Sequence, residues 1–448
     1  MRDEPEVFRR YDIRGEVPDE IDEQLVYRLG VCLADYWGSG RVIVGRDGRT
    51  ASPGFYESLI EGLTSGGCDV VKTGLATTDM VAFLAKQEDA TGGVQVTASH
   101  MPPDFCGIKP LNSEGRILSN DEMSELKDIY RKRPDFSEDQ GGRTAELDKA
   151  VERYRKGVVQ RFDELFDTDL EGLEIVFDPG NAVGSLALPD VLEQLGAEVR
   201  VMNEEIDGDF PGRGPEPNEE TLEELKSGVS ETGADLGIAT DGDADRVMFV
   251  DEKGDFVPGD YPLALLGSRY VEEEDAIVCS VNTSQMVEEA VEESGGEVIH
   301  APVGAVFTAL RCLEEGLVFG GQPNGHLMDT DFVPYDSGTL FGALLPGLVA
   351  ESGKTVSELG EELPEFHLEK ADVEVEDREE KMEKLEEKVR KKYEIITDID
   401  GVKYSTGYAQ VLVRPSGSSP LLRVRSEGWT ERSAAQGLEE AVELIQNS

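Results

Sequence analysis

The sequence predicts an α/β protein in which three related α/β domains, with mixed and mainly parallel sheets, surround a central cleft and precede a C-terminal α+β domain. The chain has 448 residues, too many for one hydrophobic core, and its hydrophobic content of 38% is enough to fill several. Three successive stretches of about a hundred residues each repeat the order strand, helix, strand, loop. The final stretch opens on a charged helix and departs from this plan.

We expect the four domains to cover residues 1–145, 146–254, 255–362 and 363–448. The first boundary follows residues 131–145, which are polar and rich in turn-forming residues. In this division each of the first three domains carries one sheet.

In the first domain, a helical pattern over residues 19–36 precedes a strand at 41–44. After a turn and a second helix, a buried strand around Val94 runs into a tight turn at 97–100. We expect this turn to lift the hydroxyl of Ser99 into the open, because reactive groups gather on loops at the ends of rigid strands.

The second domain repeats the plan with a helix at about 146–166 and strands at 174–177 and 233–239. The second of these strands opens into an aspartate-rich loop at 240–246, and a hairpin over 246–257 closes the domain. A further helix and strand lie between the two strands.

The third domain begins with a strand at 276–279 and ends with a strand at 316–319 that runs into the loop 320–326. Parallel sheets carry their ligand loops at the carboxyl ends of their strands. The loops at 97–100, 240–246 and 320–326 should therefore converge on one cleft.

The C-terminal domain begins with a charged amphipathic helix over residues 377–393. The apolar stripe of this helix consists of Met382, Leu385 and Val389. Two short strands should flank the turn at 414–420, and a helix over 430–445 ends the chain. The acidic face of the first helix is expected to be solvated.

The charge balance narrows the possible partners. Asp and Glu number 94 against 43 Lys and Arg, a net charge of −51 that is spread along the chain. This excess disfavours nucleic acids and anionic membranes as partners, and its even spread argues against an acidic interaction tail. We interpret it as a sign of a salt-accumulating organism, a halophilic archaeon, in which high ionic strength screens the repulsion.

The cysteines and the hydropathy pattern predict a cytoplasmic protein. The five cysteines are scattered and lack zinc-ligand spacing, so reduced thiols are expected: Cys32, Cys68, Cys106, Cys279 and Cys312. The N-terminal residues lack the apolar core of a signal peptide, and no apolar run is long enough to span a membrane.

Ser99 and the three aspartates are the strongest candidates for chemistry. Ser99 could be a nucleophile or phosphate carrier, or it could simply cap the following turn. The carboxylates of Asp241, Asp243 and Asp245 alternate along what should be an extended loop, where like charges require a cation between them. Carboxylate oxygens favour magnesium, or else calcium or manganese.

An EF-hand is the competing interpretation of the aspartate loop, because Glu252 falls on its twelfth position. Against it, Arg246 stands where that motif requires glycine, and strands should flank the loop. Arg246 beside a metal ion would suit a phosphate ligand.

Three further segments are less specific. Arg414, followed by serines and glycine in RPSGSSP, has the components of a phosphate cradle, and Arg423 and Arg425 add positive charge, although such turns are also common structural features. The alternating side chains at 322, 324 and 326 could bind hydroxyl groups or form an ordinary loop. Arg14 in YDIRG could pair with an acidic neighbour.

Together the motifs YDIRG, TASHMP, DGDADR, GGQPNGH and RPSGSSP occur in an order that resembles the α-D-phosphohexomutase family over essentially the whole chain. That family comprises phosphoglucomutases, phosphomannomutases and their amino-sugar relatives. The resemblance implies that the C-terminal domain has the TBP-like fold of the family's fourth domain. It also implies a phosphoserine at Ser99 that, with the three aspartates, holds one Mg²⁺ ion.

The resemblance further implies a reaction. The phosphoserine would give its phosphate to a sugar monophosphate, and the hexose 1,6-bisphosphate formed would return its other phosphate to the serine. Arg246 would neutralise the transferring group, and Lys109, with Arg14 or His100, would assist proton transfer. Substrate-binding residues would be Tyr11, Gln322, Asn324, His326, Arg414, Ser416, Gly417, Ser418 and Arg423.

The sequence departs from the family pattern where the sugar is recognised. Gln322 and Asn324 replace the usual glutamate and serine, and Met101, Ala305 and Ser418–Ser419 also differ. We therefore expect an active monomer or homodimer that converts glucose or mannose phosphates, with glucosamine phosphate as the alternative. A non-catalytic sugar-phosphate-binding relative is a second alternative, and an aspartyl phosphatase fits poorly.

Overall fold

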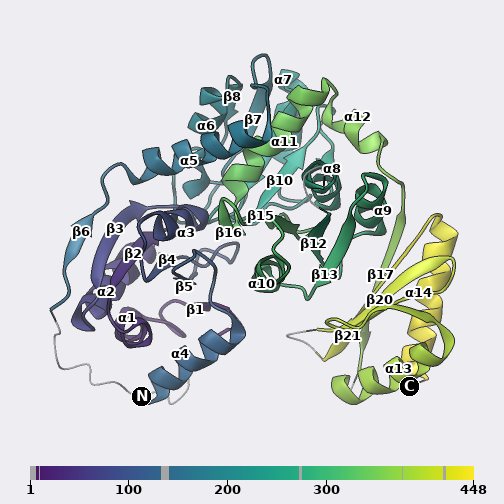
Figure 1. Ribbon diagram of the computed structural model, residues 1–448, viewed down its shortest axis with the longest axis horizontal. Helices are drawn as coiled ribbons and strands as arrows, with labels where there is room; N and C mark the ends of the chain where they lie inside the picture. The colour runs from purple at the N-terminus through teal and green to yellow at the C-terminus, as the bar shows by residue number, and fades with distance from the viewer. Residues whose placement is uncertain are drawn as a thin grey trace. The chain divides into compact units, whose positions relative to one another are not determined.

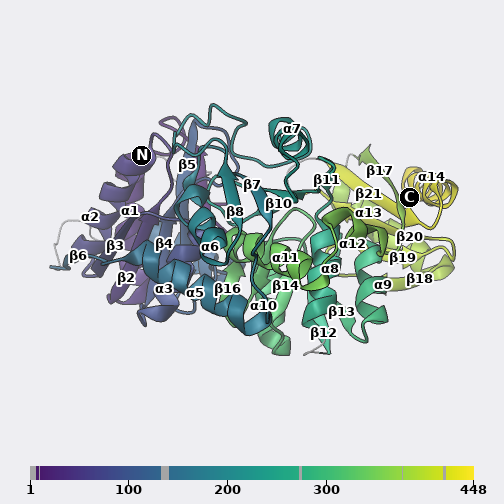
Figure 2. The same ribbon diagram turned by 90° about the horizontal axis from the view of Figure 1, so that it is seen from above.

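The computed structural model describes residues 7–9, 11–132, 141–271, 275–375, 377–416 and 420–447. Its chain divides into two compact units (Figure 1 and Figure 2), one formed by residues 1–258 with 324–358 and the other by residues 259–323 with 359–448. We describe each unit by itself. None of the described helices combines the length and the apolar character needed to span a membrane.

The first sheet of the first unit has six strands in the order β1-β5-β4-β2-β3-β6. These are β1 (Ile13–Glu16), β2 (Arg41–Arg46), β3 (Asp69–Leu75), β4 (Gly92–Val96), β5 (Phe105–Asn112) and β6 (Thr144–Glu146). The central pairs are parallel, while β5 runs antiparallel to both β1 and β4. The sheet is therefore mixed, as the sequence predicted.

Helices cover this sheet on both faces. They are α1 (Glu23–Trp37), α2 (Ser52–Ser65), α3 (Thr78–Gln87) and α4 (Asn120–Lys132). Alternate valines such as Val42 and Val44 pack with α1, α2 and α4 in one core. On the other face α3 lies close to Gly93, whose hydrogen in place of a side chain leaves room for Val81. Apolar residues at every second strand position thus fix one helical layer.

The second sheet has the order β11-β10-β9-β7-β8. Its strands are β7 (Glu174–Asp178), β8 (Glu198–Val201), β9 (Leu236–Thr240), β10 (Val247–Val250) and β11 (Phe256–Val257). Its helices are α5 (Ala150–Leu165), the short 3₁₀ helix η1 (Val183–Leu186), α6 (Leu188–Gln194) and α7 (Glu223–Thr232). The β9–β10–β11 meander is antiparallel, and β7 pairs in parallel with β8 and β9. The predicted hairpin at 246–257 is confirmed.

The first unit also contains the antiparallel hairpin β15 (Leu327–Asp329) and β16 (Val333–Asp336), followed by α11 (Gly338–Ser352). In the second unit the parallel strands β12 (Ala276–Ser280), β13 (Glu297–Ala301) and β14 (Phe319–Gly321) pack with α8 (Asp260–Tyr270), α9 (Gln285–Glu293) and α10 (Ala305–Glu315). The helix α12 (Val356–Glu361) follows α11 along the chain.

The C-terminal part of the second unit is a five-stranded antiparallel sheet with two helices on one face. The elements are β17 (His367–Glu374), α13 (Arg378–Lys392), β18 (Glu394–Thr397), β19 (Val402–Ser405), β20 (Ala409–Pro415), β21 (Leu421–Gly428) and α14 (Glu431–Gln446). The predicted stripe of Met382, Leu385 and Val389 faces this core. The α+β prediction for this domain is confirmed.

Three expectations about elements were wrong. The strand expected at 316–319 begins at Phe319, because Gly316 adopts a left-handed conformation (φ 71°) that ends α10. The helix expected from 146 begins at Ala150, after Lys149 at φ 55°. The strands around the turn at 414–420 are seven and eight residues long, not short, because β20 pairs with β21 over all seven of its residues.

Candidate active site in the first unit

The serine turn, residues 97–105, follows β4 directly. Thr97 Oγ1 accepts a hydrogen bond of 2.9 Å from the Ser99 amide, and Ser99 itself is left-handed (φ 51°). Its side-chain oxygen donates to Asp241 Oδ2 at 2.7 Å and lies 3.2 Å from His100 Nδ1. The expectation that Ser99 stands in the open is wrong, since only 3% of its surface is exposed. Asp241 and His100 lie against its hydroxyl.

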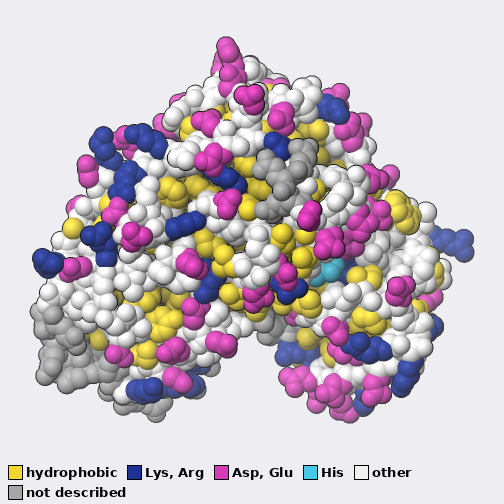
Figure 3. All heavy atoms as spheres, viewed as in Figure 1, with side chains coloured by type: hydrophobic (Ala, Val, Ile, Leu, Met, Phe, Trp, Pro, Cys, Tyr) yellow, Lys and Arg dark blue, Asp and Glu magenta, His cyan; other side chains and the backbone are white. Residues whose placement is uncertain are grey.

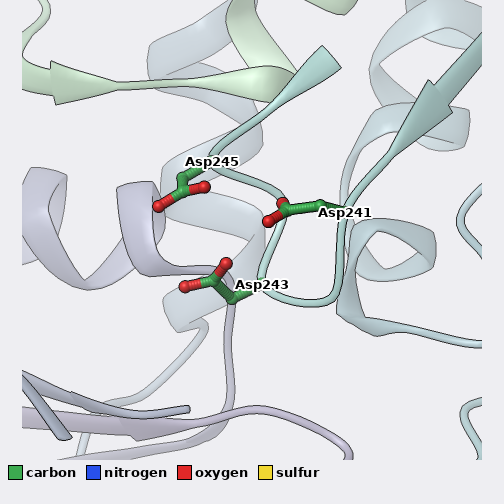
Figure 4. Close-up of side chains that lie close together, drawn as sticks. All are labelled: Asp241, Asp243 and Asp245. Carbon is green, nitrogen blue, oxygen red and sulfur yellow. The ribbon is translucent and has the colours of Figure 1, made fainter. Parts of the chain in front are cut away.

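The aspartate loop, residues 241–246, joins β9 to β10. Its carboxylates point toward one another (Figure 4), and the candidate ligand oxygens of Asp241, Asp243 and Asp245 all lie within 4.8 Å of each other. The loop is a turn with Ala244 at φ 59°, not the extended segment expected from the alternation. The turn nevertheless brings the carboxylates of the same three residues close together.

The aspartates are buried and only partly satisfied. None exposes more than 2% of its surface, and among the described residues Asp243 Oδ1 and Asp245 Oδ1 have no hydrogen-bond partner. An EF-hand is excluded because strands flank the loop and Glu252 accepts a hydrogen bond from the backbone of Ser357 at 3.2 Å. Two buried carboxylate oxygens without donors fit a bound cation.

Lys109 on β5 faces the aspartate loop. Its Nζ donates to Asp243 Oδ2 at 2.8 Å and to Asp245 Oδ2 at 2.5 Å, and lies 3.3 Å from Tyr335 Oη. Burial alone would lower the pKa of Lys109, but the two carboxylates outweigh it and hold that pKa above its ordinary value. Thr78, at the start of α3, donates to Asp243 Oδ2 at 2.5 Å.

The surroundings shift the pKa values of Asp241 and Asp245 in opposite directions. Burial, with the nearby Asp245 and Asp243, raises the pKa of Asp241 well above its usual range. Burial also acts to raise the pKa of Asp245, but Lys109 outweighs it and the pKa is lowered. A positive ion placed among the three would favour the ionised form of Asp241.

His100 is held neutral. Burial, and then the charges of Arg246 and Arg14, lower its pKa to about 2. A neutral imidazole beside Ser99 Oγ can accept a hydrogen bond from that hydroxyl.

Arg246 and His326 form a second polar group at the aspartate loop. Arg246 Nε donates to His326 Nε2 at 3.0 Å, and His326 Nδ1 lies 3.0 Å from Asp336 Oδ2. Arg246 Nη1 lies 3.6 Å from Glu216. Because Nε2 of His326 accepts from Arg246, a neutral His326 carries its ring proton on Nδ1.

The N-terminal motif lies on β1. Arg14 pairs with Asp12 at 3.4 Å, as the structural alternative for that arginine anticipated, and Tyr11 is half-buried. Burial raises the pKa of Asp12, and Arg14 partly offsets it.

The remaining candidates belong to both units. Asn324, in the first unit, is exposed. In the second unit Gln322 is buried and accepts from the Gly304 amide at 3.0 Å, while Arg414 pairs with Asp400 at 2.5 Å. Ser416 is buried and Arg423 exposed. Gly417 and Ser418 lie outside the described residues.

The first unit thus brings Ser99, His100, Lys109, Arg246, His326 and the three aspartates together. Sequence reasoning missed Thr78 and Tyr335, whose positions carry no local motif. It also missed Arg49, which contacts the serine turn. The turn 45–49 at the end of β2 was the signal for this arginine, since Arg49 stands there two residues after Asp47.

Four successive segments of the chain match models of one protein family. These models are described as the alpha/beta/alpha domains I, II and III and the C-terminal domain of phosphoglucomutase/phosphomannomutase, and they match residues 5–136, 152–254, 258–366 and 371–444.

Similar proteins carry related names. The chain is 38% identical to a probable phosphoglucosamine mutase of Methanopyrus kandleri, over 98% of this chain and 97% of that protein. It is 34% identical to a phosphoglucomutase/phosphomannomutase of Thermococcus kodakarensis, over 99% of both.

A solved structure agrees with these matches. The crystal structure of a phosphoglucomutase/phosphomannomutase family protein from Burkholderia thailandensis is 25% identical, with a TM-score of 0.88, over 98% of this chain and 97% of that one. Four matched domains in order, together with full-length relatives, establish that the chain belongs to the phosphoglucomutase/phosphomannomutase family and is a phosphohexomutase, an isomerase of carbohydrate metabolism.

Proposed function

We propose that this enzyme interconverts hexose 1-phosphate and hexose 6-phosphate, with glucose or mannose as the sugar, through a phosphoserine at Ser99 and a hexose 1,6-bisphosphate intermediate. The observation that carries the proposal is the hydrogen bond of 2.7 Å from Ser99 Oγ to Asp241, in a group of three buried carboxylates that also faces Lys109. A hydroxyl placed there can carry a phosphate whose charge needs compensation.

The three aspartates suit Mg²⁺. Their oxygens converge, and two of them lack donors within the described part of the chain. Asp241, Asp243 and Asp245, with Ser99, would hold the ion. When bound, Mg²⁺ would supply positive charge to the oxygens of the transferring phosphate.

The protein's own residues account for the rest of the transfer. A sugar hydroxyl attacks the phosphorus and gives up its proton as the new P–O bond forms, the P–Oγ bond breaks, and the electron pair stays on Ser99 Oγ, which takes up a proton in return, so that the step moves one proton from the sugar hydroxyl to the serine. Lys109 is held protonated and so acts as a hydrogen-bond donor, while neutral His100 lies 3.2 Å from the serine oxygen and can accept a hydrogen bond from it. Arg246 and Arg14 would neutralise charge, and His326 orients Arg246.

Residues of each unit would bind the rest of the substrate. Arg414, Ser416, Gly417, Ser418 and Arg423 would hold the non-reacting phosphate, and Gln322 with Asn324, His326 and Tyr11 would contact the sugar. The pairing of Arg414 with Asp400 would then have to open to admit the phosphate. Gln322 offers its amide nitrogen, which has no partner among the described residues.

Phosphoglucosamine is the second candidate substrate, because the 38% identical relative from Methanopyrus kandleri bears that name. A non-catalytic binding protein is disfavoured, because nothing in the serine and aspartate cluster has been replaced by an inert residue. Five free, buried cysteines suit the cytoplasm, where thiols stay reduced. The domain boundaries, the monomer or homodimer state and the halophilic origin remain our predictions.

The test is a substrate panel. Glucose, mannose and glucosamine 1-phosphates are supplied in turn with Mg²⁺, high KCl and a trace of the matching bisphosphate, and the 6-phosphate product is measured. Turnover of glucose or mannose phosphate supports the proposal, and turnover of glucosamine phosphate alone supports the second candidate. Both candidate functions would be overturned if the enzyme converted none of these sugar phosphates and its Ser99 accepted no phosphate.

A further inference from the structure

We propose that Arg49 is a positioning residue that holds the backbone of the serine turn so that Ser99 Oγ stands where phosphate transfer requires it. The inference rests on the proposed role of Ser99 as phosphate carrier. Arg49 follows β2, is completely buried, and belongs to none of the groups that would touch substrate or metal.

All five N–H groups of the Arg49 side chain have acceptors. Nε donates to Asp47 Oδ2 at 3.1 Å. The two terminal nitrogens donate to four backbone carbonyls of the serine turn, those of Ser99, Met101, Pro102 and Phe105, at 2.6, 2.6, 2.6 and 2.9 Å. One guanidinium thus satisfies four carbonyls of a seven-residue stretch whose backbone otherwise forms few internal bonds.

This arrangement is specific to arginine. The planar guanidinium presents five donors in fixed directions, whereas the lysine ammonium presents three from a point charge. Without Arg49, these carbonyls would lose the donors that it supplies, and for the buried Ser99 carbonyl the loss would carry the full cost of desolvation. The turn would then relax toward another backbone path.

Ser99 depends on this path more than its neighbours do. Its φ of 51° is left-handed, a conformation that costs a non-glycine residue free energy and persists only where the surroundings determine it. The Arg49 Nη2 bond to the Ser99 carbonyl acts on that same residue. A shift of this carbonyl changes the backbone dihedral angles at Ser99. It therefore moves Ser99 Oγ relative to Asp241.

Arg49 is itself firmly held. Asp47 accepts from the Arg49 amide at 3.1 Å and from the Ser52 hydroxyl, and the Asp47 amide donates to the Val96 carbonyl at the end of β4. The ring of Phe210, in the second domain, lies 5.0 Å from the guanidinium carbon and covers its face. The guanidinium therefore joins the ends of β2 and β4 and is shielded from water.

The contacts give Arg49 no direct part in chemistry. With all five donors engaged by backbone and Asp47, none remains for a phosphate oxygen. Its removal should thus change how fast Ser99 reacts while leaving substrate affinity nearly as it is.

The experiment compares Arg49→Ala and Arg49→Lys with Arg116→Ala. Arg116 is a matched control, because its side chain is only 8% exposed and it donates to the Ile117 carbonyl and to Glu122, away from the serine turn. Phosphate transfer from hexose 1,6-bisphosphate to Ser99 is followed by mass spectrometry, and kcat and KM are measured separately. Thermal unfolding monitors the fold of each variant.

We expect Arg49→Ala to lower kcat and the rate of Ser99 phosphorylation together by about 100-fold, the effect of a misplacement of about 1 Å, with little change in KM. Arg49→Lys should lose less than Arg49→Ala, and guanidinium at a millimolar, non-denaturing concentration should restore part of the activity of Arg49→Ala only. Arg116→Ala should keep wild-type kcat even if its unfolding temperature falls.

If Arg49→Ala does not fold, the Arg49→Lys variant carries the test through its kcat and its phosphorylation rate. The inference is overturned if the folded Arg49 variants phosphorylate Ser99 at the wild-type rate, or if Arg116→Ala loses as much kcat as they do. A wild-type enzyme that never phosphorylates Ser99 would instead overturn the proposed function, so the two failures are distinct.

Discussion

Ser99 donates a hydrogen bond of 2.7 Å to Asp241, a residue 142 positions further along the chain. The two residues belong to different sheets, since Ser99 follows β4 and Asp241 follows β9. A second link joins the same two sheets, because the Thr78 amide donates to the Asp243 carbonyl at 3.0 Å. The candidate site is thus formed where the ends of two sheets meet, and its geometry depends on both.

Replacing Ser99 by alanine should abolish turnover and phosphate uptake from labelled hexose 1,6-bisphosphate, because the acceptor oxygen is gone. The fold should persist, since the change removes one hydroxyl. Ser124→Ala, on the exposed face of α4, is the control and should retain full uptake. Label on the Ser99→Ala protein would show that another residue carries the phosphate.

Asp243→Asn should weaken Mg²⁺ binding by at least about 10-fold, the loss that even outer-shell changes to metal sites cause. The substitution removes the negative charge of a carboxylate whose Oδ1 atom has no hydrogen-bond donor among the described residues. Calorimetric titration with MgCl₂ measures the affinity without any substrate. Asp209→Asn, an exposed aspartate of the same domain, should bind Mg²⁺ like the wild type. Equal affinities in the two variants would remove Asp243 from the site.

Much of the fold followed from local pattern. Buried valines at alternate positions indicated β2 and β4, and the helical stripe at Met382, Leu385 and Val389 faces the C-terminal core. The aspartate loop and the serine turn were found because their residue types recur in short motifs at strand ends. These signals are contained within a few neighbouring residues, so one sequence suffices to see them.

The rest of the candidate site arises from contacts between distant segments. Tyr335, which donates to Asp245 Oδ2 at 2.9 Å, comes from a hairpin 90 positions away. The positive φ angles of Ser99 and Ala244 are equally hidden, because glycine usually marks that conformation. Local patterns do not encode such contacts, and for this reason the burial of Ser99 was missed.

Replacing Lys109 by methionine should destabilise the metal-free protein by about 3–5 kcal/mol, because it leaves the buried carboxylates of Asp243 and Asp245 without their cation. Saturating Mg²⁺ should recover part of this loss by supplying charge to the same oxygens. Denaturant unfolding with and without MgCl₂ measures both effects.

Lys156→Met is the control for Lys109. Its partner Glu152 and its own side chain are largely exposed, so its loss should cost no more than about 1 kcal/mol. A Lys109→Met protein as stable as this control without metal would contradict the account of the buried cluster.

Potassium chloride should stabilise the protein. The net charge of −51 leaves acidic side chains spread over the face shown in Figure 3, and salt screens their mutual repulsion. Thermal unfolding should therefore move to higher temperature between dilute buffer and molar KCl. Sucrose of matched viscosity controls for solvent effects other than charge. An unfolding temperature that does not rise with KCl would argue against a salt-adapted protein.

Asp79 should make stability fall as the pH rises from about 4 to about 6. This carboxyl is buried at the start of α3, where it accepts from Tyr154 at 2.5 Å and Ser337 at 2.6 Å. Burial raises its pKa from 3.8 to about 6, although these donors act in the opposite direction. In that pH window Asp79 keeps its proton in the folded protein, whereas the unfolded chain has released it. The stability that Asp79 contributes is therefore complete below the unfolded pKa and is lost as the pH rises through the folded pKa.

The size of this effect is about 3 kcal/mol, since each pKa unit corresponds to about 1.4 kcal/mol. Asp79→Asn cannot titrate, so the stability of the wild type relative to this variant should decline by that amount across the window. Asp163→Asn, on the exposed side of α5, is the control for removal of a charge. Denaturant midpoints measured at several pH values give the comparison. A wild-type advantage over Asp79→Asn that stays constant or grows with pH would show that Asp79 is ionised in the folded protein, with Tyr154 and Ser337 donating strongly enough to offset its burial.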